Sequence, residues 1–148
     1  MGYRRPGWLT QHVFNRIVDA ATRTGVSLWG SRVLRVRGRK SGEMRSTPVN
    51  LLTHAGARYL VAPRGETQWV RNLRAAGEGE LVLGRRTERF RAVEVEDADK
   101  PDLLRAYLRR WRVEVGVFFG GVRADSPDED LRRIAPGHPV FRIETPGA

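Results

Sequence analysis

Between residues 32 and 96, apolar and polar positions mostly alternate with a period of two, the pattern of half-buried β-strands. Turn residues, chiefly glycine and proline, separate these runs at short intervals, so we expect strands joined mainly by hairpins. A last alternating run follows close to the C-terminus. The predicted strands are residues 32–37, 46–53, 58–61, 80–83, 87–96 and 139–143.

Other segments repeat their apolar residues every three or four positions, as on one face of a helix. Gly77 is a suitable C-cap for the second of these segments, and Asp99 is a suitable N-cap for the third. An apolar, glycine-containing stretch, VEVGVFFGG, occupies residues 113–121. The predicted helices are residues 10–21, 67–76 and 99–111, with a shorter one near 127–134.

These elements predict an α+β fold that is mainly β, a small antiparallel barrel of about six strands with short flanking helices. No internal repeat or linker divides the chain, so we expect residues 1–148 to form a single domain. The first helix is expected to lie across one opening of the barrel. The alternative is a helix on a membrane surface, because Arg4, Arg5 and Arg16 accompany its apolar face.

Several kinds of site are excluded or disfavoured by composition. The chain has no cysteine, which excludes disulfides, thiolate metal sites and cysteine nucleophiles. His12, His54 and His138 are not at metal-ligand spacing, so we assign no metal site, and we interpret His138 as structural. No apolar run approaches the ~20 residues of a membrane span, and no signal peptide is evident. We therefore expect a cytoplasmic protein, with membrane association at the inner face as an option.

The net charge of +10 implies an anionic partner, and three classes are open: nucleic acid, a membrane surface, or a phosphorylated or carboxylated small molecule. Nearly all the positive charge is arginine, which binds phosphate and carboxylate in a bidentate manner. The arginines are scattered rather than gathered in one arm. Scatter argues against a dedicated nucleic-acid arm, and we expect no nucleic-acid partner.

The most informative stretch is the loop at residues 38–45, GRKSGEMR, between the first two strands. Arg39, Lys40 and Arg45 place three cations beside the Ser41 hydroxyl, a set that can bind a phosphate. The alternative is an ordinary solvated hairpin tip. Since little else in the chain suggests acid–base or metal chemistry, an enzyme of this sequence would rely on a bound cofactor.

Three motifs occur in a fixed order: GRKSGxxRxTP at 38–48, VAPRG at 61–65 and WxxNL at 69–73. This order resembles the deazaflavin-dependent nitroreductase and quinone reductase family, and the likeness extends over about residues 30–96. Members of that family are split β-barrels, similar to FMN-binding barrels, and use coenzyme F420. The resemblance implies the same fold and cofactor here.

The resemblance also implies which residues bind the cofactor. The basic loop would hold its phosphate and acidic tail, and Thr47 and Pro48 would lie along the ring or its ribityl chain. The segment at 62–65, Trp69 and Asn72 would border the deazaflavin ring. The alternative for the last two is that Trp69 is a core residue and Asn72 a surface residue of its helix. The implied cofactor contacts are Arg39, Lys40, Ser41, Arg45, Thr47, Pro48, Ala62, Pro63, Arg64, Gly65, Trp69 and Asn72.

The sequence departs from the family pattern in two places. The loop at 62–67 is shorter than usual, and late tyrosines that line the substrate pocket of relatives are absent. Here the corresponding region offers Trp111, Phe118 and Phe119, with Tyr107 on the preceding helix, and we assign these four residues to the substrate pocket. Such a pocket suits a flat or apolar acceptor.

The resulting hypothesis is an oxidoreductase that transfers a hydride from reduced F420 to a quinone, enone, nitro compound or unsaturated acyl chain. An FMN-dependent enzyme of the same fold is the first alternative, and a non-catalytic nucleic-acid-binding module is the second. A homodimer is also possible, since related barrels are often dimers. No catalytic acid or base is assigned.

Overall fold

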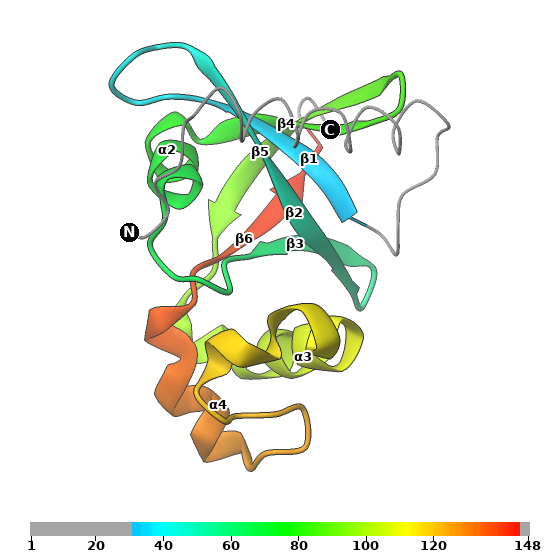
Figure 1. Cartoon of the computed structure of the whole chain (residues 1–148), viewed down its shortest axis with the longest axis vertical. Coiled ribbons are helices and arrows are strands. Elements are labelled where there is room, and N and C mark those ends of the chain that lie inside the picture. The colour runs from blue at the N-terminus through cyan, green and yellow to red at the C-terminus, as the bar shows by residue number, and fades with distance from the viewer. Residues whose placement is uncertain (1–30, 146–148) are drawn as a thin grey trace.

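The computed structural model describes residues 31–145, and within them six antiparallel strands close into a barrel (Figure 1). Neighbouring strands follow the order β1-β2-β3-β6-β5-β4 around the barrel. The predicted helix at 10–21 lies outside the described residues, as does its membrane-surface alternative. The strands are β1 (Ser31–Arg37), β2 (Met44–His54), β3 (Ala57–Val61), β4 (Glu78–Leu83), β5 (Arg86–Glu94) and β6 (Val140–Glu144).

The barrel interior is filled by every second residue of the strands, as the period of two predicts. On β1, Leu34 and Val36 are buried inside, and Leu60 on β3 and Phe90 on β5 face the same interior. The residue after Leu60 on β3, Val61, faces outward from the barrel and is buried as well. Strand β3 therefore contributes to two separate hydrophobic clusters.

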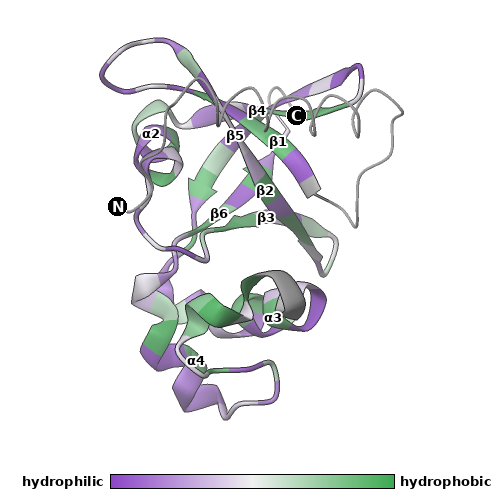
Figure 2. Cartoon of the chain, viewed as in Figure 1, coloured by the Kyte–Doolittle hydropathy of each residue, from purple (hydrophilic) through white to green (hydrophobic). Residues whose placement is uncertain are grey.

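The second cluster lies between the barrel and a layer of helices beneath it (Figure 1). This layer comprises α3 (Pro101–Val115), α4 (Asp128–Ile134) and the short 3-10 helices η2 (Asp97–Asp99), η3 (Gly116–Phe119) and η4 (Ala135–Gly137). Figure 2 shows hydrophobic and hydrophilic residues interleaved along these helices. Leu104 and Leu131 turn inward from α3 and α4 and pack in this cluster.

Helix α2 (Gln68–Ala76) stands apart from that layer, at the side of the barrel (Figure 1). Val70 and Leu73 are its buried residues and join the interior cluster of the barrel. Gly77 ends the helix with a φ of 76° and donates its N–H to the Leu73 carbonyl at 2.8 Å. The predicted glycine C-cap is confirmed.

The predicted fold class is confirmed, and the differences lie at the ends of elements. Asp99 is not the N-cap of α3, because it belongs to η2 and its N–H bonds to the Glu96 carbonyl at 2.9 Å. Helix α3 begins at Pro101 and continues past Trp111, where the backbone leaves helical geometry (φ −118°, ψ 20°), to Val115. No helix within residues 31–145 is long and apolar enough to cross a membrane.

Candidate functional site

The basic loop joins β1 to β2 (Figure 1), and its last two residues, Met44 and Arg45, are the first of β2. Gly38 donates to the Glu43 carbonyl at 2.8 Å and Gly42 donates to the Gly38 carbonyl at 2.9 Å, which closes the loop on itself. Glycine is favoured at both positions. Gly42 has a φ of 77°, and a Cβ on Gly38 would come within 2.9 Å of the Ser41 Oγ.

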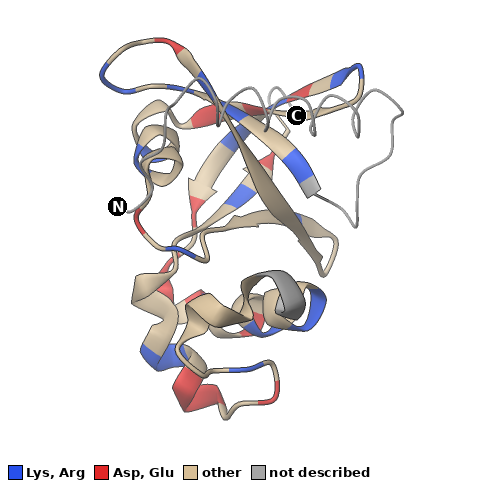
Figure 3. Ribbon diagram, in the orientation of Figure 1, with Lys and Arg blue, Asp and Glu red and all other residues tan. Residues whose placement is uncertain are grey.

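Charged residues occupy the tip of this loop, as Figure 3 shows. Lys40, Ser41 and Arg45 are exposed. The Ser41 hydroxyl oxygen accepts the Glu43 backbone N–H at 3.1 Å, so its position is held while its own O–H remains a donor. Glu43 is the single acid within the loop, and the cations outnumber it.

The loop is attached to helix α2 through Arg39. Its backbone N–H donates to the Asn72 Oδ1 at 3.1 Å, and its Nη1 donates to the same oxygen at 2.8 Å. The Arg39 Nη1 also donates to the Gln68 Oε1 at 3.0 Å. Asn72 is only 6% exposed, so its interpretation as a surface residue is wrong.

The N-terminus of α2 lies next to this attachment and is electropositive. Its first turn contains no acidic residue, and the first amide groups of any helix lack partners within the helix. Thr67 precedes the helix in an extended conformation and does not cap it with its side chain. Its hydroxyl is buried and has no hydrogen-bond partner among the described residues. Such a helix start is suited to an anion.

Residues 62–65 lead from β3 into this helix and pack closely on the chain before β6. Ala62 is buried and donates its N–H to the Pro139 carbonyl at 2.9 Å. Gly65 is also buried, with a φ of 84°, and a Cβ there would lie 3.1 Å from the Gly137 carbonyl oxygen. This segment therefore has a rigid support on one side.

His138 belongs to that support. Its Nδ1 lies 3.3 Å from the Ala62 carbonyl oxygen, and since a carbonyl only accepts, the nitrogen must carry the proton. The ring stacks on Phe119 with centroids 4.2 Å apart and planes 14° from parallel. Burial lowers the pKa of His138, and hydrogen bonding to the backbone of Ala62 and Pro63 offsets this effect only in part. These contacts agree with the structural role expected for His138.

The four residues assigned to the substrate pocket separate into two groups. Phe118 is 37% exposed, its neighbour Val117 is 83% exposed, and the Arg64 guanidinium lies 4.9 Å from the Phe118 ring centroid. The other three, Tyr107, Trp111 and Phe119, are fully buried between barrel and helices. The Trp111 indole donates to the Leu51 carbonyl at 3.1 Å. Only Phe118 of the four presents its ring to the surface.

Trp69, Thr47 and Pro48 are also divided between interior and surface. Trp69 is half-buried and packs on the interior cluster, with its ring 6.1 Å from that of Phe141. Thr47 pairs with the inward-facing Leu34, whereas Pro48 is exposed on the opposite side of β2. The side chains of Thr47 and Pro48 therefore cannot both face one ligand.

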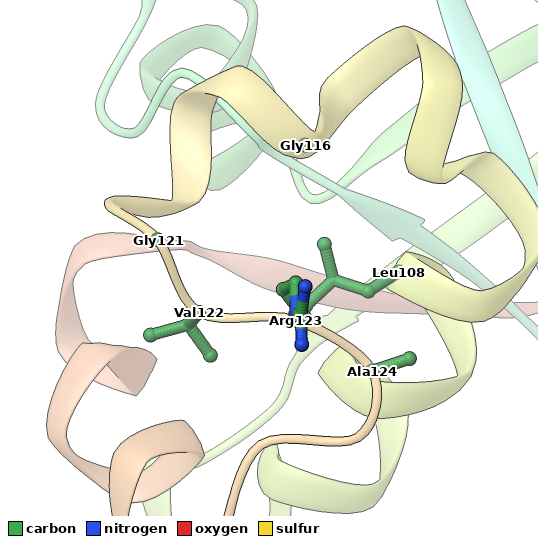
Figure 4. Close-up of a pocket in the computed structure, with 6 residues that line it drawn as sticks. All are labelled: Leu108, Gly116, Gly121, Val122, Arg123 and Ala124. Atoms are coloured by element: carbon green, nitrogen blue, oxygen red, sulfur yellow. The ribbon is translucent and has the colours of Figure 1, made fainter.

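Two surface cavities of the described residues lie elsewhere. One, of about 250 Å³, is lined by Leu108, Gly116, Gly121, Val122, Arg123 and Ala124 below α3 (Figure 4). The other, of about 310 Å³, is lined by His54, Tyr59, Val95, Asp99, Asp102, Leu103 and Arg142. Neither includes a predicted site residue. Within residues 31–145, no group of three or more His, Asp or Glu side chains is placed to hold a metal ion.

The structure thus brings the basic loop and helix α2 together through the bonds of Arg39 to Gln68 and Asn72. It brings the segment at 62–65 together with Phe118 through Arg64. Gln68, Thr67 and His138 were not assigned to the site from the sequence. Gln68 was the most accessible to prediction, because it lies one helical turn before Asn72 on the same face. His138 is distant in sequence from the residues it supports.

One family model, described as F420H(2)-dependent quinone reductase, matches residues 9–117 of the chain. A comparison with curated proteins gave no significant match. Among solved structures, one described as a domain-swapped dimer is 18% identical and has a TM-score of 0.54, over 95% of this chain and 100% of that one.

Two further structures are similar. An F420-H2 dependent reductase (FDR-A) is 18% identical with a TM-score of 0.53, over 78% of this chain and 94% of that one. A conserved hypothetical protein from Mycobacterium tuberculosis is 17% identical with a TM-score of 0.55, over 86% of this chain and 78% of that one. At such identities the likeness to solved structures establishes the fold alone.

Proposed function

This chain belongs to the F420H(2)-dependent quinone reductase family and is an oxidoreductase that uses coenzyme F420, and from this premise we propose how its residues serve the reaction. The basic loop and the start of α2 bind the anionic part of the cofactor. Residues 62–65 and Trp69 border its ring. The acceptor is a quinone-type compound, bound on the side of Phe118.

The donor set fits a cofactor with a polyanionic tail. Lys40 is exposed at the loop tip and Arg45 at the start of β2, and the O–H of Ser41 lies between them in sequence. The electropositive start of α2 and the buried hydroxyl of Thr67, which has no partner within residues 31–145, add donors on the adjacent element. Guanidinium groups and a helix N-terminus bind phosphate and carboxylate groups by charge-assisted hydrogen bonds.

The planar ring of the cofactor suits the other half of the site. Gly65 has no side chain, and its backbone is supported from behind by Gly137, so a flat ring can lie close to it. The half-buried Trp69 offers an aromatic surface next to that segment. Of the two residues of β2, Thr47 faces the cofactor. Pro48 is exposed on the opposite side of the strand and does not contact it.

When bound, reduced F420 supplies a hydride from its ring carbon C5. The chain positions the acceptor against that atom and excludes water, which lowers the barrier by orientation. Phe118 and the Arg64 guanidinium that lies over its ring form the acceptor side of the site. The buried Tyr107, Trp111 and Phe119 belong to the hydrophobic cluster that supports this side. A quinone takes up the hydride and one proton, and His138, buried with its Nδ1–H on the Ala62 carbonyl, is not assigned as the donor of that proton.

The observation that carries the proposal is the attachment of a cationic loop to helix α2 by Arg39, which donates to Gln68 at the start of the helix and to Asn72 one turn further along. An ordinary hairpin tip would have no reason to be fixed along the first turns of a neighbouring helix. The nitro, enone and acyl acceptors named above remain alternatives to the quinone. They require the same cofactor site, and only their fit against Phe118 would differ from that of a quinone.

The first experiment is titration of the purified protein with oxidised F420, read by tryptophan fluorescence, with FMN in parallel. We expect saturable quenching by F420 alone, because Trp69 borders the ring site. Lys40→Ala and Arg45→Ala should each weaken F420 binding, and the effect should shrink as salt is raised. Quenching by FMN alone, or F420 affinity unchanged in both variants, would contradict the proposed site.

The acceptor is tested with reduced F420 and a panel of quinones, enones and nitro compounds of similar size. We expect turnover to be fastest with quinones. Phe118→Ala should raise KM for the acceptor with little change in F420 affinity. Val117→Ala is the matched control, since this neighbour is more exposed and is not assigned to the site. A homodimer is proposed from the family as well, and light scattering on the purified protein tests it.

A further inference from the structure

We infer that Asn72 is a positioning residue that acts on the cofactor through the basic loop, rather than a residue that contacts the ring. This inference rests on the proposed function. It changes the role implied by the family resemblance, in which Asn72 borders the deazaflavin. The evidence is the pair of hydrogen bonds that its side-chain oxygen accepts from Arg39.

The Asn72 Oδ1 has both of its lone-pair directions occupied. It accepts the Arg39 backbone N–H at 3.1 Å and the Arg39 Nη1 at 2.8 Å. An amide oxygen has two such sites, so no acceptor capacity is left for a ligand. Asn72 is also buried at 6% exposure, on the side of α2 from which Leu73 enters the barrel interior.

The bond to the backbone N–H is the important one for position. Arg39 directly follows Gly38, where the chain leaves β1, and precedes the exposed Lys40 and Ser41. Fixing the Arg39 N–H on a rigid helix therefore fixes the direction in which the loop leaves the barrel. The loop's own hydrogen bonds, from Gly38 and Gly42, set its shape but not its placement relative to α2.

Placement matters because two donor groups must address one anion. The cations are on the loop, and the free amides are at the start of α2. Asn72 lies one helical turn beyond Gln68, which begins α2, and both residues accept bonds from the same guanidinium. Without Asn72 the loop would sample other positions, and the two donor groups would no longer converge.

The test compares two ligands in the full-length protein: F420 and the deazaflavin riboside that lacks the phosphate and acidic tail. For Asn72→Ala we expect F420 binding to weaken on the order of tenfold, from the loss of two hydrogen bonds, one of them to a charged group. Affinity for the tail-free riboside should stay within twofold of wild type. Asn50→Ala makes the same change in β2, away from the loop, and should alter neither affinity.

A second variant covers the case in which Asn72→Ala does not fold. Asn72→Asp keeps an oxygen that accepts both Arg39 bonds and removes the amide N–H donors. If Asn72 acts through its oxygen, Asn72→Asp binds the tail-free riboside as wild type does. If it acts by donating to the ring, Asn72→Asp loses that affinity, and the inference is overturned.

Other outcomes are equally decisive. Equal loss of both ligands in Asn72→Ala, with a wild-type melting temperature, would place Asn72 at the ring and overturn the inference while leaving the proposed function intact. Unchanged F420 affinity in Asn72→Ala would overturn it too. If the wild-type protein binds neither ligand, the proposed function itself fails, and with it the premise of this inference.

Discussion

Replacement of His138 tests whether the support beneath residues 62–65 has the energetic weight that its geometry implies. In His138→Ala the chain loses the hydrogen bond to the Ala62 carbonyl, about 1 kcal/mol, and the stack on Phe119, about 0.5–1.5 kcal/mol. The removed ring also leaves a cavity in a region with little freedom to collapse. We expect a total loss of about 2–4 kcal/mol in the free energy of unfolding.

His138→Asn separates these contributions. An asparagine amide can donate to the Ala62 carbonyl in place of the Nδ1–H, so this variant should recover about 1 kcal/mol relative to His138→Ala. The assay is urea denaturation at pH 7.5, followed by tryptophan fluorescence and circular dichroism. Equal stability of the two variants would contradict the hydrogen bond, and a loss below about 1 kcal/mol in His138→Ala would contradict the whole account of the support.

The same pair predicts a pH dependence. Burial lowers the pKa of His138 in the native state below the value of about 6.5 expected in the unfolded chain. Below pH 6.5 the unfolded chain therefore binds more protons at this site, so the contribution is full above that pH and declines as pH falls toward the native pKa. Wild-type stability should drop across this window more steeply than that of His138→Asn. If the free energies of unfolding of wild type and His138→Asn change in parallel with pH, the reasoning is refuted. His54→Asn, the same substitution at a histidine of β2, is the matched control.

Three other substitutions test separate parts of the structure. Trp111→Phe should cost about 1–3 kcal/mol by urea denaturation, because it leaves the Leu51 carbonyl without its indole donor, and an unchanged midpoint would contradict that bond. Gly65→Ala should cost about 1–2 kcal/mol and weaken F420 binding, because its φ is 84° and its Cβ would lie 3.1 Å from the Gly137 carbonyl oxygen. Arg74→Met should cost less than about 1 kcal/mol, since both of its ion pairs are exposed; a larger loss would indicate a coupled network.

Local patterns in the sequence predicted the barrel well. The alternation at 32–37 is strand β1, observed as Ser31–Arg37, and the helical face at 67–76 is α2, observed as Gln68–Ala76. In both cases neighbouring residues suffice, because side chains two apart on a strand or three to four apart on a helix share a face. The glycine C-cap at Gly77 is likewise a local property of backbone conformation.

Where an element end depended on distant packing, prediction was less accurate. Asp99 is a residue type that favours the N-cap position, yet it belongs to the 3-10 helix η2 that precedes α3. The next residue, Lys100, turns inward and donates to the Ala135 carbonyl at 3.0 Å. At Trp111, whose indole donates to the Leu51 carbonyl of β2, the backbone leaves helical geometry, and the helix then resumes as far as Val115. Tertiary contacts outweigh capping preference at such positions.

The candidate site divides in the same way. The basic loop, the small-residue segment and their order along the chain are properties of the sequence, and they led to the family. The tertiary structure decided that Asn72 is buried and that its oxygen accepts the backbone N–H and a guanidinium N–H of Arg39, 33 positions away. It also decided that Phe118 is exposed while Phe119 is not. The physical reason is that composition and periodicity define which residues seek an apolar or polar environment. Only the packing of barrel against helices determines which of two such environments each one occupies.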